Sequence, residues 1–139
     1  MQNLVRFGIS MDSRLLQSFD QMAATKGYSS RSEAIRDLIR DKLVDATWAE
    51  EDEEVVGTIT LVYDHETHEL SDRLIDLQHE FHEGVISSLH VHLDSHNCLE
   101  VLVVKGKGKK VKGFADRIIA IKGVKHGKLT TTTTGKGIF

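Results

Sequence analysis

Residues 89–93 read Leu-His-Val-His-Leu, and after a short polar turn residues 98–103 read Cys-Leu-Glu-Val-Leu-Val. Both segments alternate apolar with polar side chains, which is the pattern of β-strands whose two faces meet different environments. They predict a β-hairpin in which His90 and His92 share one face of the first strand. Cys98 joins that face if it pairs with His92, or if it lies at the mouth of the turn.

The histidines and the cysteine of this hairpin form a candidate metal site. Imidazoles two residues apart on a strand stand about 6–7 Å apart, and both can reach one ion through bonds of about 2 Å. A thiolate is a third donor, and Cys98 is the single cysteine of the chain. A lone histidine is more often a surface residue, and a lone cysteine a small buried hydrophobe. A His-x-His pair beside the single cysteine is more specific and favours a metal site.

The composition bounds the class of protein. The chain has 139 residues, enough for one compact domain or two small ones. Its single cysteine suits a reducing cytoplasm, and no apolar run approaches the roughly 20 residues of a membrane span, so we expect a cytoplasmic protein with no membrane partner. Residues 1–46 hold seven Lys/Arg against six Asp/Glu, residues 47–104 one against fourteen, and residues 105–139 ten against one. The net charge of −3 therefore does not exclude a nucleic-acid partner.

The first fifty residues predict the order strand, helix, helix. Residues 3–11 alternate, a helix capped at Asp12 or Ser13 runs to Gly27, and residues 30–33 (Ser-Arg-Ser-Glu) form a capping box that opens a second helix. A lone strand leaves its backbone groups unpaired, whereas two copies can pair their strands and share one helical core. This is the ribbon-helix-helix arrangement, whose ribbon enters the major groove of DNA.

Two parts of this unit are candidates for DNA contacts. The outward face of the strand carries a side chain that can bind guanine through two hydrogen bonds, and the start of the second helix offers backbone N–H groups to a phosphate. The candidates are Arg6, Gly8 and Ser10 on the strand, and Ser29, Ser30 and Arg31 at the helix. The alternative is an ordinary dimerisation strand followed by an amphipathic helical hairpin.

An acidic run at residues 50–54 predicts a solvated linker over about 47–56, with one domain over 1–50 and a second over 51–139. The second domain reads as a strand over 55–63, a helix over about 66–83, the two hairpin strands, a helix over about 109–122 and a strand over 125–133. The order βαββαβ is that of the ferredoxin-like fold, whose helices cover one face of the sheet. The fold class is therefore α+β.

The apolar side chains of the hairpin are expected to face the helices, which leaves the three metal-binding candidates on the bare face. These apolar residues are Val91, Leu93, Leu99 and Val101. A second subunit normally covers such a face, so we expect the metal site at an interface. His79 is the nearest candidate for a further ligand, supplied by the neighbouring protomer, although it could equally be a solvent-facing helix residue. The other histidines, at positions 65, 68, 82, 96 and 126, are expected at the surface.

With these features in place, the chain resembles the nickel-responsive transcriptional regulator (NikR) family over nearly its whole length. The resemblance rests on Arg-Ser-Glu-Ala-Ile-Arg-Asp at 31–37, Gln-His at 78–79, Leu-His-Val-His at 89–92, Cys-Leu-Glu at 98–100, Phe-Ala-Asp at 114–116 and Gly-Val-Lys-His-Gly at 123–127. It implies a homotetramer, a dimer of dimers, in which central ferredoxin-like (ACT-like) domains carry two ribbon-helix-helix dimers.

The resemblance also implies a ligand set and a function. Members bind one Ni(II) per subunit in a square plane, through positions matching His90, His92 and Cys98 of one chain and His79 of another. Nickel loading favours binding to an operator with paired half-sites, typically repressing nickel-uptake genes. Glu33 and Asp37 match positions that the family uses for a weaker cation site.

The residues leave several points open. The family commonly shows Arg-x-Thr-x-Thr on its reading strand, whereas residues 6–10 are Arg-Phe-Gly-Ile-Ser, and Gly8 has no side chain to contact a base.

Three imidazoles and a thiolate suit Ni(II) or Cu(II) in a plane and Zn(II) in a tetrahedron. Glu100 is expected to be a polar neighbour of the ligands rather than a catalytic base. The alternatives are a metalloenzyme, a metal store, or a ribbon-helix-helix regulator that senses another metal or a small ligand. We do not expect an enzyme, because four protein ligands leave no in-plane position for a substrate.

Overall fold

The computed structural model describes residues 3–50, 52–81 and 84–139. Its chain divides into two compact units, Met1–Arg40 and Asp41–Phe139. The division falls inside the second helix, earlier than the boundary after residue 50 that the acidic run indicates. The reason is that the end of this helix packs into the second unit through Trp48, which is 4% exposed. No helix among the described residues has the length and hydropathy needed to cross a membrane.

The first unit contains helix α1 (Ser13–Thr25) and the start of helix α2 (Arg31–Ala49). The Asp12 carboxylate accepts a hydrogen bond from the Arg14 backbone N–H at 2.7 Å and so caps α1. Gly27 follows α1 with a φ of 83°, a conformation that costs glycine little. At the start of α2, the Ser30 hydroxyl accepts a hydrogen bond from the Glu33 N–H at 3.2 Å. Both predicted helix starts are thus confirmed by their caps.

Residues 3–12 form neither helix nor strand in this single chain, unlike the strand predicted over 3–11. Val5 is 83% and Phe7 72% exposed, and Leu38 on α2 is 46% exposed. A strand needs the backbone of a second strand to pair with, and the chain alone offers none to this segment. The paired ribbon therefore remains a prediction about two copies of the chain.

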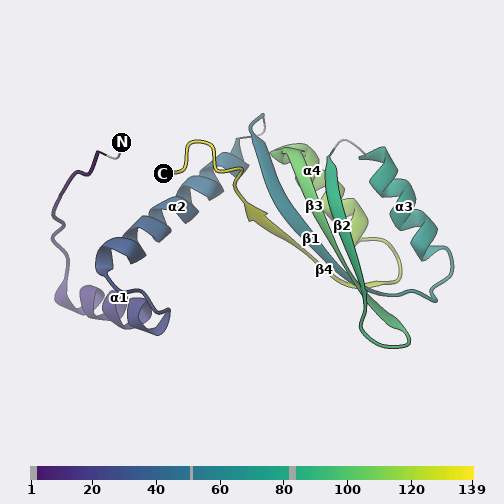
Figure 1. The fold of residues 1–139 in the computed structure, drawn as a ribbon, viewed down its shortest axis with the longest axis horizontal. Coiled ribbons are helices and arrows are strands. Elements are labelled where there is room, and N and C mark those ends of the chain that lie inside the picture. Colours follow the sequence, from purple (N-terminus) through teal and green to yellow (C-terminus); the bar gives the residue numbers. More distant parts are fainter. Residues whose placement is uncertain (1–2, 51, 82–83) are drawn as a thin grey trace. The chain divides into compact units, whose positions relative to one another are not determined.

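The second unit is a four-stranded antiparallel sheet with two helices (Figure 1). Its elements are β1 (Glu54–Asp64), α3 (Leu70–Glu80), β2 (Val85–His92), β3 (Asn97–Lys107), α4 (Gly108–Ile119) and β4 (Val124–Thr132). The strand order is β2-β3-β1-β4. This is the arrangement expected of the βαββαβ order, so the predicted fold class is confirmed.

Both helices are shorter than predicted. The pattern indicated a helix from about residue 66, but Glu69 has a left-handed φ of 63° and α3 starts at Leu70. The predicted end at residue 83 lies outside the described residues, and α3 ends at Glu80. Helix α4 ends at Ile119 rather than Lys122, and Gly123 then turns the chain with a φ of 103°. The first turn leads from β1 into α3, and the second leads from α4 back to the sheet at β4.

The core lies between the helices and one face of the sheet. Alternate residues of β1 are buried there, and they pack with Leu70 and Leu74 of α3 and with Val111 and Ile118 of α4. On β3 the residues that join this core are Cys98, Leu102 and Val104, each 0% exposed. Because Cys98 and Glu100 have the parity of Leu102, the helices cover the face that carries the thiol.

This result overturns the predicted orientation of the hairpin. Val91, Leu93, Leu99 and Val101 were expected to face the helices, yet they have the opposite parity, and Leu89, Val91 and Leu93 are 59%, 39% and 53% exposed. The error has a physical cause: β3 is apolar on both faces, so alternation cannot decide which face the helices cover. The bare face is the apolar one, and the metal-binding candidates lie on the other.

Trp48 joins the end of α2 to this sheet. Its indole N–H donates a hydrogen bond to the Thr132 carbonyl at 2.8 Å, and its backbone carbonyl accepts one from the Lys112 ammonium at 3.3 Å. The ring lies against Gly57, where a Cβ would stand 3.3 Å from the indole and 2.8 Å from the Thr130 carbonyl oxygen. Glycine at this position of β1 therefore makes room for the indole.

Candidate metal centre

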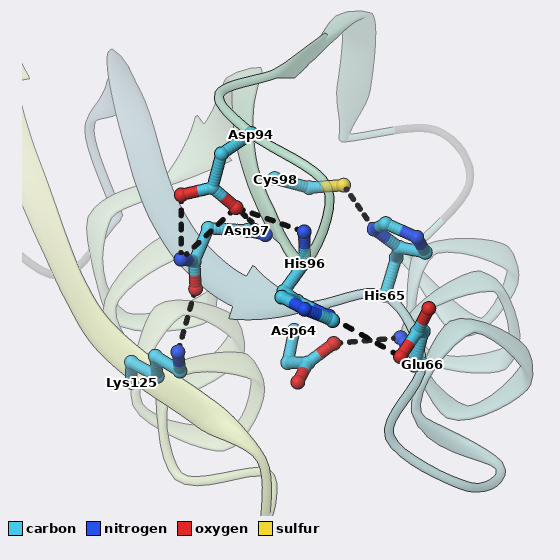
Figure 2. A network of polar contacts seen from close by, with 8 residues as sticks. All are labelled: Asp64, His65, Glu66, Asp94, His96, Asn97, Cys98 and Lys125. Atoms are coloured by element: carbon cyan, nitrogen blue, oxygen red, sulfur yellow. Dashed lines mark hydrogen bonds and ion pairs between the residues drawn. The ribbon is translucent and has the colours of Figure 1, made fainter.

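The candidate metal centre lies where three strands meet at one end of the sheet. The register pairs Cys98, near the start of β3, with His92 at the end of β2 and with Tyr63 near the end of β1. The predicted pairing of His92 with Cys98 is therefore confirmed. The Cys98 sulfur lies 3.5 Å from His92 Nδ1. It also lies 3.3 Å from Nδ1 of a second imidazole, that of His65, and Figure 2 shows this second contact.

His90 adds a third imidazole next to this group. Its ring centroid is 5.0 Å from that of His92, and its Nδ1 lies 3.4 Å from the hydroxyl oxygen of Tyr63. Both hairpin histidines are exposed, because β2 is the edge strand and the helices leave its outer end uncovered. The structure thus brings together three of the four predicted ligands, with the imidazoles open to solvent and the sulfur buried.

His65 is a member of this group that the sequence did not single out. It directly follows β1, and its backbone N–H donates to the His96 carbonyl at 3.1 Å, which holds the end of β1 against the turn after β2. His65, His92 and Cys98 each offer a ligand atom within 4.8 Å of the others. The available signal is that His65 follows Tyr63 by two residues, but that signal has meaning only once the β1–β3 register is known.

His79 does not belong to this group in its own chain. It lies in the last turn of α3, and Val85 at the start of β2 donates a hydrogen bond to the Phe81 carbonyl just beyond that helix. His92 is at the other end of β2, seven residues away from Val85. At about 3.3 Å a residue this is about 23 Å of strand. The two sites are therefore at opposite ends of the same strand.

The electrostatic surroundings keep the isolated thiol protonated. Burial raises the pKa of Cys98, and the carboxylates of Asp64, Glu100 and Asp94 raise it further. Burial also raises the pKa of Tyr63 to about 12, with Glu100 and Cys98 adding to the effect. A bound cation would reverse this balance at the sulfur, because a metal ligand is the thiolate and binding displaces the proton.

Glu100 stands beside the imidazoles on the covered face, paired across the strands with His90. Burial raises the pKa of its carboxyl group, while His90 lowers it. Its Oε2 atom is buried and has no hydrogen-bond partner within the described residues. An acceptor left unpaired at this place and a sulfur within 3.5 Å of two imidazole nitrogens fit a cation of the Ni(II), Cu(II) and Zn(II) class.

Comparisons with known proteins identify the family of the chain. Residues 56–132 match the family model described as NikR C terminal nickel binding domain, and residues 5–46 match the model described as ribbon-helix-helix protein, copG family. The chain belongs to the nickel-responsive regulator (NikR) family. The resemblance noted from the sequence is thereby confirmed, as is a ribbon-helix-helix domain followed by a NikR C-terminal domain.

Relatives with similar sequences match nearly the whole chain. A Geobacter sulfurreducens protein with the name "Putative nickel-responsive regulator" is 61% identical over 98% of each chain. One of Pyrococcus furiosus is 57% identical over 97% of this chain and 98% of its own. Among solved structures, an uncharacterized protein of Thermotoga maritima has a TM-score of 0.53 at 17% identity, covering 58% of this chain and 100% of its own. That likeness concerns the fold alone.

The predicted DNA-contacting residues of this NikR chain fall into two groups. Arg6, Gly8 and Ser10 lie in the exposed segment before α1. At the start of α2, Arg31 donates two hydrogen bonds of 2.8 Å to the Asp20 carboxylate, and the Ser29 hydroxyl donates to Glu33 at 2.8 Å. These side chains already form hydrogen bonds within the unit. A phosphate at the start of α2 would therefore meet backbone N–H groups, which is the contact predicted from the sequence.

At the predicted second cation site, the carboxylates of Glu33 and Asp37 accept hydrogen bonds from protein side chains. Glu33 accepts the Ser29 hydroxyl, and Asp37 accepts the Tyr28 hydroxyl at 2.7 Å and Arg40 at 2.9 Å. Those two donors hold the pKa of Asp37 below its ordinary value. The pair forms no group of three metal ligands among the described residues, and this site remains a prediction.

Proposed function

We propose that this chain is a nickel-responsive, DNA-binding transcriptional regulator, in which nickel bound at the candidate metal centre promotes operator binding and repression of nickel-uptake genes. The observation that carries the proposal is the Cys98 sulfur set between imidazoles, on a chain whose first unit has a ribbon-helix-helix sequence. The ion would be held by His90, His92 and Cys98 of one chain and His79 of the partner subunit, one ion per subunit. When bound, it supplies a fixed link between two chains.

The need for a partner's ligand follows from where His79 lies. Because own-chain His79 is a strand's length from Cys98, it can join a ligand set only across an interface. The apolar bare face, where Leu89 and Val91 are exposed, offers a separate surface to a second copy, on the side of the sheet opposite to the hairpin ligands. We propose a homotetramer, with paired ribbon-helix-helix dimers matched to paired half-sites. Binding across chains would then couple metal occupancy to the spacing of the DNA-binding units.

A nickel titration followed by absorption spectroscopy tests the metal site. We expect one Ni(II) per chain and a thiolate-to-metal charge-transfer band that is absent from Cys98→Ala. Because the bound sulfur is a thiolate and the bound imidazoles are neutral, binding should weaken as the pH falls. A band of unchanged intensity in Cys98→Ala would exclude the sulfur as a ligand.

Mixing two variants tests whether the site is shared. A His79→Ala chain keeps its hairpin ligands, and a Cys98→Ala chain keeps its His79. If each site uses both chains, refolding the two variants together restores part of the charge-transfer band. The intact hairpin of a His79→Ala chain can then share an ion with the intact His79 of a Cys98→Ala chain. The matched control mixes His92→Ala with Cys98→Ala. Both substitutions damage the hairpin ligands, so no chain in the mixture has an intact hairpin and the band is not restored. Absence of recovery in the first mixture would refute sharing.

DNA binding is tested by measuring operator affinity with and without Ni(II) at one salt concentration, since phosphate contacts make affinity strongly salt-dependent. We expect nickel to increase the affinity for the operator more than for random DNA, and His79→Ala to remove the increase. Equal affinities with and without nickel would refute the regulatory role. A metal store would show normal nickel stoichiometry with no effect on DNA.

A further inference from the structure

A second group of metal-ligand side chains lies beside the candidate metal centre and shares none of its residues. Asp64 ends β1, Glu66 follows it by two residues, and His96 lies in the turn between β2 and β3. Each offers a ligand atom within 4.8 Å of the other two. In Figure 2 the three side chains gather on one side of the strand ends, and the Cys98 sulfur lies toward His65 on the other.

Backbone contacts fix the segments that carry these side chains. The Glu66 N–H donates to the Asp64 carboxylate at 2.9 Å, and the His65 N–H donates to the His96 carbonyl at 3.1 Å. The Asp94 carboxylate accepts the N–H groups of His96 and Asn97 at 2.8 and 2.7 Å. Glu66 Oε2 is already 3.3 Å from His96 Nδ1. The three ligands therefore stand on backbone that is held in place before any ion binds.

The charge of the group calls for a cation. Asp64 and Glu66 bring two carboxylates into one small space. No lysine or arginine of the described residues forms an ion pair with either carboxylate. The nearby Lys125 ammonium instead donates to the Asn97 side-chain oxygen at 2.6 Å. The carboxylates are thus close together, with the His96 imidazole beside them and no lysine or arginine of the described residues paired with them.

We infer that Asp64, Glu66 and His96 form a second divalent-cation site, distinct from the sulfur-containing centre. Two carboxylate oxygens and one imidazole nitrogen suit Mn(II), Fe(II), Co(II) or Zn(II), with water completing the coordination. Bonds of about 2.1 Å place ligand atoms at most about 4.2 Å apart, so these side chains need shifts of a few tenths of an ångström. His96 and Glu66 side chains are each 61% exposed, so such shifts are unhindered.

Occupancy would tie the end of β1 to the turn between β2 and β3. That turn connects His92 to Cys98, two residues of the candidate metal centre. An ion bound to the carboxylates and to His96 therefore restricts the turn, and slower amide exchange over residues 93–96 is a direct sign of it.

Mn(II) is the probe for this site, because it prefers oxygen ligands and is the weakest competitor for a thiolate. The full-length protein is titrated with Mn(II), and the electron paramagnetic resonance signal of the free ion is followed. We expect one bound Mn(II) per chain, in the unaltered protein and equally in Cys98→Ala. Glu66→Gln and His96→Gln should each weaken the affinity by at least tenfold, on the order of the losses seen when the surroundings of a metal ion are altered.

The controls are Asp72→Asn and His68→Gln, which remove an exposed carboxylate and an exposed imidazole from the same region and should bind Mn(II) as the unaltered protein does. Equal affinities in Glu66→Gln, His96→Gln and the controls would overturn the inference, as would unchanged exchange over residues 93–96 on adding Mn(II). Because the Cys98→Ala chain retains this site, failure here and failure of the nickel response are separate results.

Discussion

Trp48→Ala should loosen the second unit strongly while leaving the nickel ligands in place. Trp48 is 4% exposed, and its indole packs at Gly57 and donates to the Thr132 carbonyl. Removing a buried tryptophan costs about 3–5 kcal/mol, of which one neutral hydrogen bond accounts for about 1 kcal/mol. We therefore expect a loss of about 4 kcal/mol for Trp48→Ala and about 1–2 kcal/mol for Trp48→Phe, which keeps most of the ring.

Hydrogen–deuterium exchange measures this loss in the second unit alone. A decrease of about 4 kcal/mol in the free energy of opening speeds amide exchange by about a thousandfold. The amides of β1 and β3 should show this change at a fixed protomer concentration, because association also stabilises the fold. Fluorescence cannot serve for the comparison, because Trp48 is the single tryptophan and both variants remove it.

The matched control is Thr47→Ala, the preceding residue, whose hydroxyl donates a hydrogen bond within α2, to the Leu43 carbonyl at 3.0 Å. It should change exchange in β1 and β3 little. Nickel stoichiometry should stay the same in all three variants, since Gly57 and Tyr63 are six residues apart on β1, or about 20 Å. A change below about tenfold in Trp48→Ala would refute the idea that the end of α2 belongs to the core of the second unit.

Four further predictions concern the sheet, the site and the DNA. Between pH 10 and 12 the metal-free protein should lose stability, because the unfolded chain releases the phenolic proton that Tyr63, with its pKa raised to about 12, retains; a Tyr63→Phe profile as steep as the original would contradict this. Val91→Asp should dissociate the assembly in analytical ultracentrifugation, whereas an unchanged oligomer would show that the bare face stays open. His65→Ala should leave nickel stoichiometry unaltered in absorption titrations, and a loss matching that of His79→Ala would make His65 a ligand. Arg6→Ala should lose about 1–3 kcal/mol of discrimination between operator and random DNA in competition assays, and equal losses on both would assign Arg6 to phosphate.

Local patterns in the sequence predicted the helices and strands of the second unit, two helix caps and one strand pairing. The helix caps at Asp12 and Ser30, the six elements of the second unit and the pairing of His92 with Cys98 all follow from signals within a few residues of each site. These features depend on hydrogen bonds and alternation along one segment. For that reason they can be inferred before the fold is known.

The errors concern features that depend on distant segments. Which face of β3 meets the helices could not be inferred, because Leu99 and Leu102 make both faces apolar. The place of His65 depends on the register between β1 and β3, which no local pattern encodes. The late start of α3 depends on the left-handed turn at Glu69. The strand over 3–11 stays a prediction, because this segment needs a second chain before it can pair. For the face of β3 and the place of His65, the deciding contacts lie outside the segment that carries the residue.

The buried position of Cys98 bears on how the protein withstands oxidants. The thiolate is the form of cysteine that reacts with peroxides and alkylating reagents, and a protonated, solvent-excluded sulfur reacts slowly. At neutral pH the metal-free chain holds its sulfur in that unreactive form, behind imidazoles that do face water. The sulfur is thereby preserved in the reduced state until a cation arrives, and air exposure of the empty protein should do it little damage.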